Sequence, residues 1–588
     1  MAKSPLDKTD GPVGVTIKLN GKAMSDTAQA VSVRVFHALN RIPEAVFTLV
    51  TDSAQLEDFV ELDSKDYALG TAVEIAAFYG TYSEMTLFKG IILSTRLRGD
   101  GREGVQMKVT CRDKALKMTD IRSSVSYLQR KDSEVMSAII KEAGLKGDIT
   151  ATQAIAPLNL RVGATDWDFL RVLADRNGYV LRVDDGTITA SEIDTSTPPV
   201  LSLTFGDDIV SMDFDVDAHR MIAESSASAW NAQTQKKLTG KDSNLPTNSQ
   251  GNTKISAFAK ALDSRSLDAN TARDLPEADL KGFAKARVAR AGLDTVHGSV
   301  TFQGSGNVKL ADMIEINGVG KRFGGKAYVT GLDHTIEEGV WSTKARMGLP
   351  QDWTSDSFGL AAAGAEALTA PIHGTQIGKV MSVAEDPDGG QRIQVSLPMI
   401  GDPPAEVWAR HATPYASNAA GIQFLPEVDD EVVVSFLNAD PNAPVVIGAL
   451  HNDVAKRPEA EAEENNIKTI VTRSKLKLTF DDDKKIIIVE TPGGHMLTMD
   501  DDATTLSMVD SNGNSLVMDS SGIKMESMAD ITMTAIGNIT AEATGDATIN
   551  GVNVTCEGQA GFTGKGGASA ELSAGGTTTV KGAMVQIN

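Results

Sequence analysis

The stretch from residue 468 to residue 588 constrains the fold more than any other part of this sequence. Apolar and polar residues alternate with a period of two along residues 530–550, as they do in short β-strands. Glycine interrupts the alternation about every eight residues, at Gly537, Gly545, Gly551, Gly558 and Gly566. Most other side chains are small or β-branched, so one copy of the ribbon cannot offset an ordering entropy of roughly 1–2 kcal/mol per residue. The stretch is therefore predicted to need partners.

Three copies wound around one axis would supply a thin continuous core and leave no free sheet edge. We therefore predict that residues 468–588 form a triple-stranded intertwined β-helix, which is a rigid needle. A single-chain, three-sided β-helix is the alternative. It requires hexapeptide repeats and about eighteen residues per turn, which the observed rhythm fits poorly.

The composition favours a mainly β, turn-rich chain over a large helical enzyme. Only 5% of the residues are aromatic, and 53 are glycine. A length of 588 residues is enough for about three to five domains. The net charge of −22 argues against a nucleic-acid partner, because phosphate binding needs clustered Lys and Arg.

The cysteines and the N-terminus indicate a cytoplasmic site of synthesis. Cys111 and Cys556 lie far apart in the sequence, which argues against a disulfide framework and favours a reducing compartment. The first residues lack the apolar segment of a secretory signal, and no run of about eighteen apolar residues predicts a membrane-spanning helix. If the protein leaves the cell, we expect a route other than a signal peptide.

Residues 12–360 are predicted to form a mixed domain of strands and a few helices. Alternating segments predict strands at residues 13–19, 31–36, 72–78, 88–93, 105–111 and 179–183. Residues 132–143 predict an amphipathic helix with Gly144 at its C-terminal end. Thr165 and Asp168 predict a capping box that begins a second helix. A third helix is predicted over residues 276–290.

Three further segments have little periodicity. Residues 231–253 are rich in Gln, Asn, Ser and Lys and predict a loop. Residues 355–376 are rich in Ala, Gly and Ser, and residues 456–466 are rich in Glu and Ala, so both predict linkers.

Residues 377–452 predict a small closed barrel, because short strands alternate with Pro- and Gly-bearing turns. Several motifs follow one another here. The sequence Pro-Glu-Val-Asp-Asp-Glu-Val-Val-Val begins at Pro426, Asp440-Pro follows, Pro-Val-Val-Ile-Gly ends at Gly448, and Asn452 closes the segment. These motifs closely resemble the oligonucleotide/oligosaccharide-binding (OB) barrel of the VgrG family, the spike proteins of contractile injection systems.

The resemblance extends over nearly the whole chain and implies a domain order. It implies a phage-hub-like domain with β-barrel modules and α+β character at residues 1–360, a linker at 361–376 and the OB barrel at 377–452. A second linker would occupy residues 453–467, and the needle residues 468–588. The segment 166–179 is similar to a characteristic helix of the family's hub domain, and the segment 324–335 to its late strands.

The resemblance also implies a function. The chain would form a homotrimer at the tip of a contractile tail, with the hub domain joined to the inner tube and the baseplate. The needle would be driven through the target envelope when the sheath contracts, so contact with the target membrane would be mechanical. The particle would assemble in the bacterial cytoplasm and be secreted or delivered on firing. Effector cargo is a further implied partner.

The end of the chain resembles family members whose blunt needle accepts a separate PAAR-type tip protein. The predicted tip-binding residues are the last six, which are Ala583, Met584, Val585, Gln586, Ile587 and Asn588. Physically, this end would expose unpaired backbone groups of three chains, and a β-rich partner could cover them.

No residue pattern predicts a catalytic, cofactor or metal site. Residues 386–390 predict a hairpin turn and lack the ligand ladder of a calcium loop. The acidic clusters 481–483 and 500–502 are predicted to be turns, with a bound cation as the alternative. The barrel lacks the mixture of aromatic and basic residues that nucleic-acid binding requires.

Two other classes of function compete with a spike. A trimeric tail fibre or adhesin would usually carry a bulky C-terminal head, whereas this sequence continues as plain strands to residue 588. A spike that carries a cell-wall hydrolase would need an inserted catalytic domain, and the link at residues 453–467 is too short for one. The chain is therefore predicted not to be an enzyme.

Overall fold

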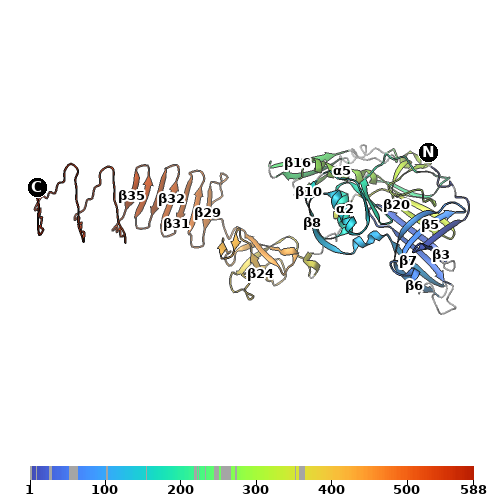
Figure 1. Ribbon diagram of the computed structural model, residues 1–588, viewed down its shortest axis with the longest axis horizontal. Helices are drawn as coiled ribbons and strands as arrows, with labels where there is room; N and C mark the ends of the chain where they lie inside the picture. The colour runs from blue at the N-terminus through green and yellow to red at the C-terminus, as the bar shows by residue number, and fades with distance from the viewer. Residues whose placement is uncertain are drawn as a thin grey trace. The chain divides into compact units, whose positions relative to one another are not determined.

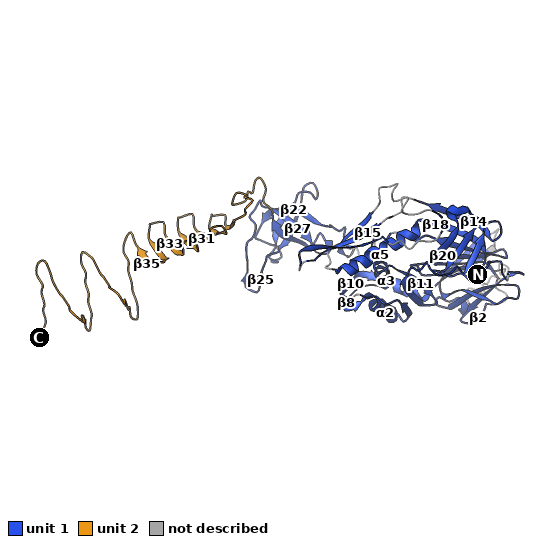
Figure 2. Ribbon diagram, turned by 90° about the horizontal axis from the view of Figure 1, so that it is seen from above, with its two compact units in different colours: residues 1–449 blue, residues 450–588 orange. Residues whose placement is uncertain are grey.

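The computed structural model describes residues 3–587 except 8, 25–28, 52–63, 101–103, 154, 218–221, 223, 232–233, 244–249, 253–265, 272–274, 351, 357–363 and 368 (Figure 1). The chain divides into two compact units, residues 1–449 and residues 450–588 (Figure 2). Strands account for more residues than helices do in both units, so the prediction of a mainly β protein is confirmed.

A thirteen-stranded sheet forms most of the first unit. Along the sheet the strands lie in the order β14 (Ile209–Val216), β18 (Val296–Gln303), β21 (Val340–Met347), β20 (Gly325–Glu337), β3 (Gln29–Ala38), β4 (Glu44–Thr51), β7 (Gly104–Arg112), β6 (Met85–Asp100), β5 (Ala72–Tyr79), β1 (Val13–Leu19) and β2 (Lys22–Ala23). Strand β19 (Met313–Asn317) pairs with β20 and with β13 (Leu201–Thr204). The sheet therefore joins the beginning of the chain to residues that follow some 300 positions later.

Smaller sheets and helices complete this part of the chain. The strands are β8 (Arg122–Lys131) with β10 (Ile155–Thr165), then β9 (Lys146–Ile149), β11 (Tyr179–Asp184) and β12 (Thr187–Glu192), and β15 (Glu224–Asn231), β16 (Lys236–Asp242) and β17 (Ser266–Thr271). The α-helices are α2 (Asp132–Glu142), α3 (Asp166–Arg176), α5 (Glu277–Asp294) and α6 (Gly320–Phe323). Short 3-10 helices are η2 (Lys65–Tyr67), η3 (Lys114–Thr119), η5 (Thr354–Asp356), η6 (Gly364–Ala367) and η7 (Leu437–Ala439).

Period-two alternation explains several strands of the large sheet, such as β4 and β21, because every second residue along most of each strand is buried. Val33 and Val35 of β3 and Phe47 of β4 are almost fully buried in one core. Tyr79 and Trp341 stack in the same core with ring centroids 5.3 Å apart. The six strands predicted in this region are confirmed, and β1 begins and ends at the predicted residues.

The predicted helices are also confirmed, with small changes at their ends. Helix α2 ends before Gly144, which has φ +64° and so occupies the left-handed region typical of a residue after a helix. The Thr165 hydroxyl accepts a hydrogen bond from the Asp168 amide at 3.1 Å, which is half of the predicted capping box. Helix α5 begins one residue after Pro276 and extends to Asp294, beyond the predicted end.

The polar segment 231–253 was predicted to be a loop, and this prediction is wrong for part of its length. Strand β16 lies within it and pairs with β15 in an antiparallel register that places Leu238 opposite Ala229. Leu238 packs against a small core of Ala227, Ala229 and Leu280. Strand β16 therefore forms although most of its side chains are polar, because Leu238 packs against Leu280 of helix α5.

A buried ion pair connects helices α3 and α5 to the chain that follows the large sheet. Asp175 and Arg290 pair, and their side chains are only 3% and 5% exposed. Asp175 also accepts a hydrogen bond from the Thr354 amide at 2.7 Å, and Arg290 donates one to the Asp352 carbonyl at 3.1 Å. The Trp353 ring lies 4.7 Å from the Phe283 ring, measured between centroids. Residues 352–354 are thus held against both helices.

Two histidines lie in neighbouring strands of the large sheet; His334 is buried and His37 is partly buried. His37 Nε2 donates a hydrogen bond to the Leu87 carbonyl at 2.8 Å, and His334 Nδ1 lies 2.9 Å from the Thr343 hydroxyl oxygen. Burial disfavours the charged imidazolium, and it lowers the pKa of His334 to about 3. Burial also lowers the pKa of His37.

We expect the first unit to lose stability as the pH falls from 7 to 5. An unfolded histidine binds a proton below a pKa of about 6.5, whereas the buried His334 stays neutral and the pKa of the partly buried His37 is lowered. Acid therefore favours the unfolded state by up to about 1.4 kcal/mol per pH unit for each histidine. Urea unfolding followed by tryptophan fluorescence should show a smaller pH dependence for His334→Gln than for the wild type. His495→Gln should change nothing, because His495 is exposed and belongs to the second unit.

The predicted closed barrel is present. Its strands follow one another around the barrel in the order β22 (Thr375–Ser382), β23 (Ile393–Leu397), β24 (Ala405–His411), β28 (Pro444–Ala449) and β27 (Glu431–Phe436). Val380, Val395, Val432 and Val434 fill its core and are fully buried. Gly378 also faces inward, since a Cβ there would lie 2.4 Å from a Val395 methyl. Two short strands, β25 (Ala416–Ser417) and β26 (Ala420–Gly421), form a hairpin outside it.

A ladder of seven antiparallel strands opens the second unit. In order they are β29 (Ile467–Val471), β30 (Lys477–Asp481), β31 (Ile486–Glu490), β32 (Met496–Asp500), β33 (Thr505–Val509), β34 (Ser515–Asp519) and β35 (Gly522–Glu526). Each strand pairs with the one before it in the sequence, so the strands lie side by side in chain order (Figure 1). All pairing in this ladder is within one chain.

The chain after the ladder has a different character. Among the described residues 528–587, none belongs to a strand and every one is exposed. The relative exposure of Ile536 and of Val552 exceeds 100%. The short strands predicted at residues 530–550 are therefore absent from the described structure of this chain. The interwinding of three chains stays a prediction.

None of the helices in the described part of the chain has the length and apolar character needed to cross a membrane.

Candidate assembly interface

One face of the strand ladder is almost entirely apolar. In each five-residue strand the second and fourth side chains point to the same side, and the strand register aligns them in two rows. One row contains Ile470, Leu478, Val489, Leu497, Met508, Leu516 and Met525, and the other contains Lys468, Phe480, Ile487, Met499, Leu506, Met518 and Ile523. Thirteen of these fourteen side chains are apolar, and we call this surface the ladder face.

The ladder face is open to solvent in a single chain. No side chain on it is buried, and Met508, Met525 and Ile523 are 52%, 59% and 71% exposed. The opposite side of the sheet is more polar: its central row contains Thr469, Thr479, Ile488, Thr498, Ser507, Val517 and Lys524, five of which are polar. In a sheet with one apolar and one polar side, the apolar side is expected to pack against another protein surface.

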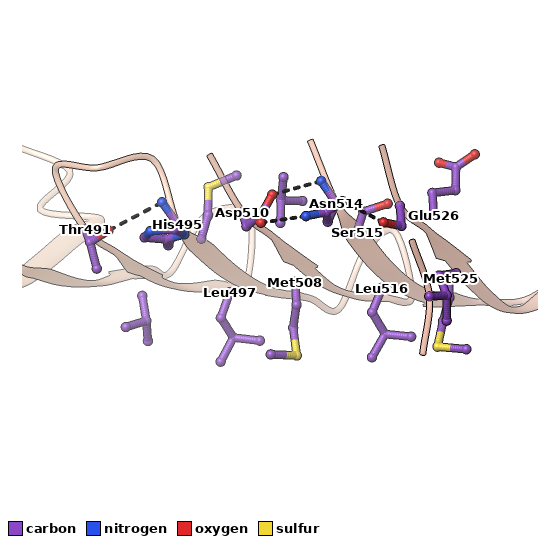
Figure 3. A pocket seen from close by; sticks show the side chains of 15 residues that line it. Thr491, His495, Leu497, Met508, Asp510, Asn514, Ser515, Leu516, Met525 and Glu526 are labelled. Atoms are coloured by element: carbon purple, nitrogen blue, oxygen red, sulfur yellow. Dashed lines mark hydrogen bonds between the residues drawn. The ribbon is translucent and has the colours of Figure 1, made fainter. Parts of the chain in front are cut away.

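A shallow apolar groove follows part of the ladder face. It has a volume of about 570 Å³ and is lined by Val489, Leu497, Met508, Leu516, Met525 and Ile531, with polar residues at one edge. Figure 3 shows Leu497, Met508, Leu516 and Met525 pointing to the same side of the sheet. The polar edge is formed by the turns that join the strands.

The turns along this edge are held by their own side chains. Between β33 and β34 the Asp510 carboxylate accepts hydrogen bonds from the amides of Asn512 and Asn514 at 2.9 and 2.8 Å. The Asn514 side-chain amide also donates to Asp510, and these bonds lower the pKa of Asp510 to about 2. Gly513 has φ +89°, a conformation that glycine adopts without strain. Hydrogen bonds within residues 510–514 therefore hold this turn.

Aspartates close the turns along the opposite edge. Asp481 accepts a hydrogen bond from the Lys484 amide at 3.1 Å, and Asp500 accepts one from the Ala503 amide at 2.8 Å. Asp519 accepts one from the Ser521 amide at 2.7 Å. The acidic clusters predicted to be turns are therefore turns. Within the described residues, no group of three or more His, Cys, Asp or Glu is arranged to hold a metal ion.

A 19-residue repeat underlies the ladder, and the sequence interpretation missed it. Asp481, Asp500 and Asp519 recur 19 residues apart, as do Leu478, Leu497 and Leu516 on the ladder face. One repeat contains two strands and two turns. The 19-residue recurrence is visible in the sequence. The sequence interpretation instead applied the glycine spacing of residues 537–566 to the whole stretch 468–588.

The predicted tip-binding residues lie at the far end of the second unit. Ala583, Met584, Val585, Gln586 and Ile587 are exposed and belong to no strand, and Asn588 lies outside the described residues. Met584 and Ile587 are 79% and 92% exposed. The structure brings none of these side chains together into a pocket, so tip binding stays a prediction.

Comparison with protein families identifies the first part of the chain. Residues 9–338, which are more than half of the sequence, match the family described as the Alg8 N-terminal domain. The chain belongs to this family. The match spans the large sheet except β21, together with helices α2, α3, α5 and α6.

A second family match covers the closed barrel. Residues 376–451 match the family described as the type VI secretion system/phage-baseplate injector OB domain. The match confirms the likeness to VgrG spike proteins that the motifs in the same segment predicted. It supports a structural role in a baseplate or a spike. A comparison with curated proteins found no match.

Several solved structures are similar to the chain. A tail protein from Neisseria meningitidis MC58 has 16% identity, covers 59% of this chain and 99% of its own, and gives a TM-score of 0.43. The 43 kDa tail protein of prophage MuSo2 from Shewanella oneidensis has 12% identity, covers 58% and 99%, and gives 0.45. A type VI secretion component from E. coli has 13% identity, covers 74% and 99%, and gives 0.39.

Proposed function

We propose that this chain is the spike subunit of a contractile injection machine and that three copies associate through the ladder face. The observation that carries the proposal is the pair of apolar rows along seven strands. Burying a Leu, Ile or Met side chain completely is worth about 1.5–3 kcal/mol. Nine side chains of the ladder face are more than a third exposed in one chain, so their burial supplies a large driving force.

The width of the ladder favours three copies. A strand of five residues is roughly 17 Å long. Three sheets of this width around one axis form a prism whose sides lie about 5 Å from the axis, which is half of the usual sheet spacing of about 10 Å. Leu, Ile and Met side chains fill such a space. Four sheets would leave an empty centre, and two would leave both flanks of the core open to water.

The ribbon after the ladder supports the same arrangement. One chain forms no strands there, although the sequence alternates with a period of two and Asp530, Asn538 and Asp546 recur every eight residues. Strand partners from two other chains would satisfy the backbone hydrogen bonds that a single chain leaves open. The needle would thus consist of a prism built from separate sheets, followed by an interwound section.

The solution mass of the chain tests this proposal. We expect the full chain to have three times its mass of 62.2 kDa and an elongated shape. A chain shortened after Asn466 should lose both the length and the stable association. A compact monomer at micromolar concentration would contradict the proposal and favour a single-chain β-helix.

The remaining roles follow from the same proposal. The first unit would join the inner tube and the baseplate, the needle would puncture the target envelope, and the role would be structural rather than catalytic. A PAAR-type protein would cover the needle end at residues 583–588. Deletion of these six residues should abolish capture of a PAAR-type protein and leave the trimer mass unchanged. Retention of capture would exclude the end as the binding site.

A further inference from the structure

A hairpin arm projects from the closed barrel, and no other described residue of the chain covers it. We call residues 412–428 the barrel arm; β25 and β26 form its hairpin. Two backbone hydrogen bonds shape it, from the Ala412 amide to the Val446 carbonyl and from the Ile422 amide to the Tyr415 carbonyl, both at 2.9 Å. Figure 2 shows the arm, marked by β25, extending away from β22 and β27.

The composition of the arm is that of a buried surface. No residue of the arm is buried, yet it carries five large apolar side chains, which are Tyr415, Ile422, Phe424, Leu425 and Val428. Phe424 is 62% and Tyr415 55% exposed. Glu427 is the one charged residue between positions 412 and 428, although 23% of the whole chain is charged. Exposed apolar clusters of this kind mark interaction sites.

A second apolar surface lies on the outside of the barrel itself. Val432 and Val434 point inward and are fully buried, so Val433 between them points outward. The register places Ile377 of β22 directly opposite Val433. Ile447, which is 52% exposed, lies at the irregularity of the neighbouring strand β28. We call Ile377, Val433 and Ile447 the barrel patch.

The tether between barrel and ladder indicates which molecule covers the arm. Residues 450–466 join the barrel to the first ladder strand, and the Glu459 carboxylate lies 2.9 Å from Lys477 Nζ on the second. The nine residues before Glu459 reach at most about 30 Å. In a trimer held together by the ladder, each barrel therefore meets the next one at an effective concentration in the millimolar range.

We propose that the barrel arm of one copy packs on the barrel patch of the next copy, so that three arms join the barrels into a closed ring. The contact is head-to-tail, because arm and patch are different surfaces, and a threefold rotation closes it. This inference rests on the trimer proposed above. It adds a second interface, in the barrel, to the one in the ladder.

Cysteine cross-linking tests the contact in the full chain. Phe424→Cys and Ile447→Cys are introduced together, with the exposed Cys556 changed to Ser. On oxidation we expect covalent dimers and trimers from the double variant and monomers from either single variant. The matched control pairs Phe424→Cys with Glu406→Cys, since Glu406 is exposed on β24 four residues before Arg410, where that strand begins to pair with β28. This control pair should not cross-link.

The outcomes of this experiment distinguish a failure of the arm contact from a failure of the proposed trimer. A trimeric mass without cross-links between residues 424 and 447 would overturn the arm contact and leave the proposed function standing. A monomeric mass would contradict the proposed function itself. As a second readout, a polarity-sensitive dye on Phe424→Cys should emit at a shorter wavelength in the trimer than in full-length Met508→Asp, in which a charge is placed on the ladder face. Equal emission from the two would count against the contact.

Discussion

Replacing Met508 with aspartate is expected to convert the trimer into a monomer. Met508 lies in the middle of the ladder face, between Leu497 and Leu516 in the register. In the assembled prism its three copies would face one axis, so the variant would place three carboxylates in an apolar core. Burying one unpaired charge costs several kcal/mol, and three like charges at one level also repel each other. Native mass spectrometry or light scattering should give a mass of one chain.

The neighbouring residue provides the control. Ser507 precedes Met508 on the same strand and points to the opposite, mostly polar side of the sheet. Ser507→Asp introduces the same residue, with the same strand propensity, into the same strand. It should remain trimeric with a thermal stability close to that of the wild type. If both variants stay trimeric, the ladder face is not the inside of the assembly.

Asp175→Asn is expected to be the most destabilising conservative change in the first unit. It preserves the shape of the side chain but leaves the buried Arg290 guanidinium without its counter-charge. Removing one partner of a buried ion pair typically costs about 3–5 kcal/mol, against a total stability of about 5–15 kcal/mol for a domain. Urea unfolding followed by tryptophan fluorescence should show a clear fall in the transition midpoint.

An exposed pair on the same helix α5 serves as the reference. Lys285 Nζ lies 3.0 Å from the Glu192 carboxylate, and both side chains are more than half exposed. Lys285→Ala should change stability by less than about 1 kcal/mol. The fluorescence of Trp353 should also respond to the loss of this ion pair, because its neighbours Asp352 and Thr354 form hydrogen bonds with Arg290 and Asp175. Unchanged unfolding in Asp175→Asn would mean that the pair does not stabilise this unit.

Local patterns were enough to predict many elements of the first unit. The alternation from Val13 to Leu19 defined β1, and Thr165 marked the start of α3, because each signal lies within a few neighbouring residues. Local signals could not predict that β3 pairs with β20, whose residues follow some 300 positions later. Nor could they predict β16, where a single core contact of Leu238 outweighs a polar composition.

The candidate interface was predicted only in outline. The need for partners follows from the small side chains around residues 530–550, because one ribbon cannot form a core. The sequence interpretation missed the division of this stretch into the strand ladder at residues 467–526 and the ribbon at residues 528–587. This division depends on whether the turns allow neighbouring strands to pair within one chain. The turn closed by Asp510 and Gly513 lets β33 and β34 pair within one chain, whereas residues 528–587 form no strands in the described chain. The ladder face became visible only when the register aligned the two apolar rows.

The 19-residue repeat also determines how a needle of this kind can change its length. One repeat contributes two strands, and neighbouring strands are about 4.8 Å apart. Loss or duplication of one repeat therefore alters the reach by about 10 Å and leaves every later strand with its original direction and inward face. An insertion or deletion of one residue within a strand would instead turn the apolar side chains that follow it in that strand to the opposite face of the sheet. The length of the needle can thus change in fixed steps. Whole repeats are the unit by which evolution or protein engineering can lengthen or shorten it.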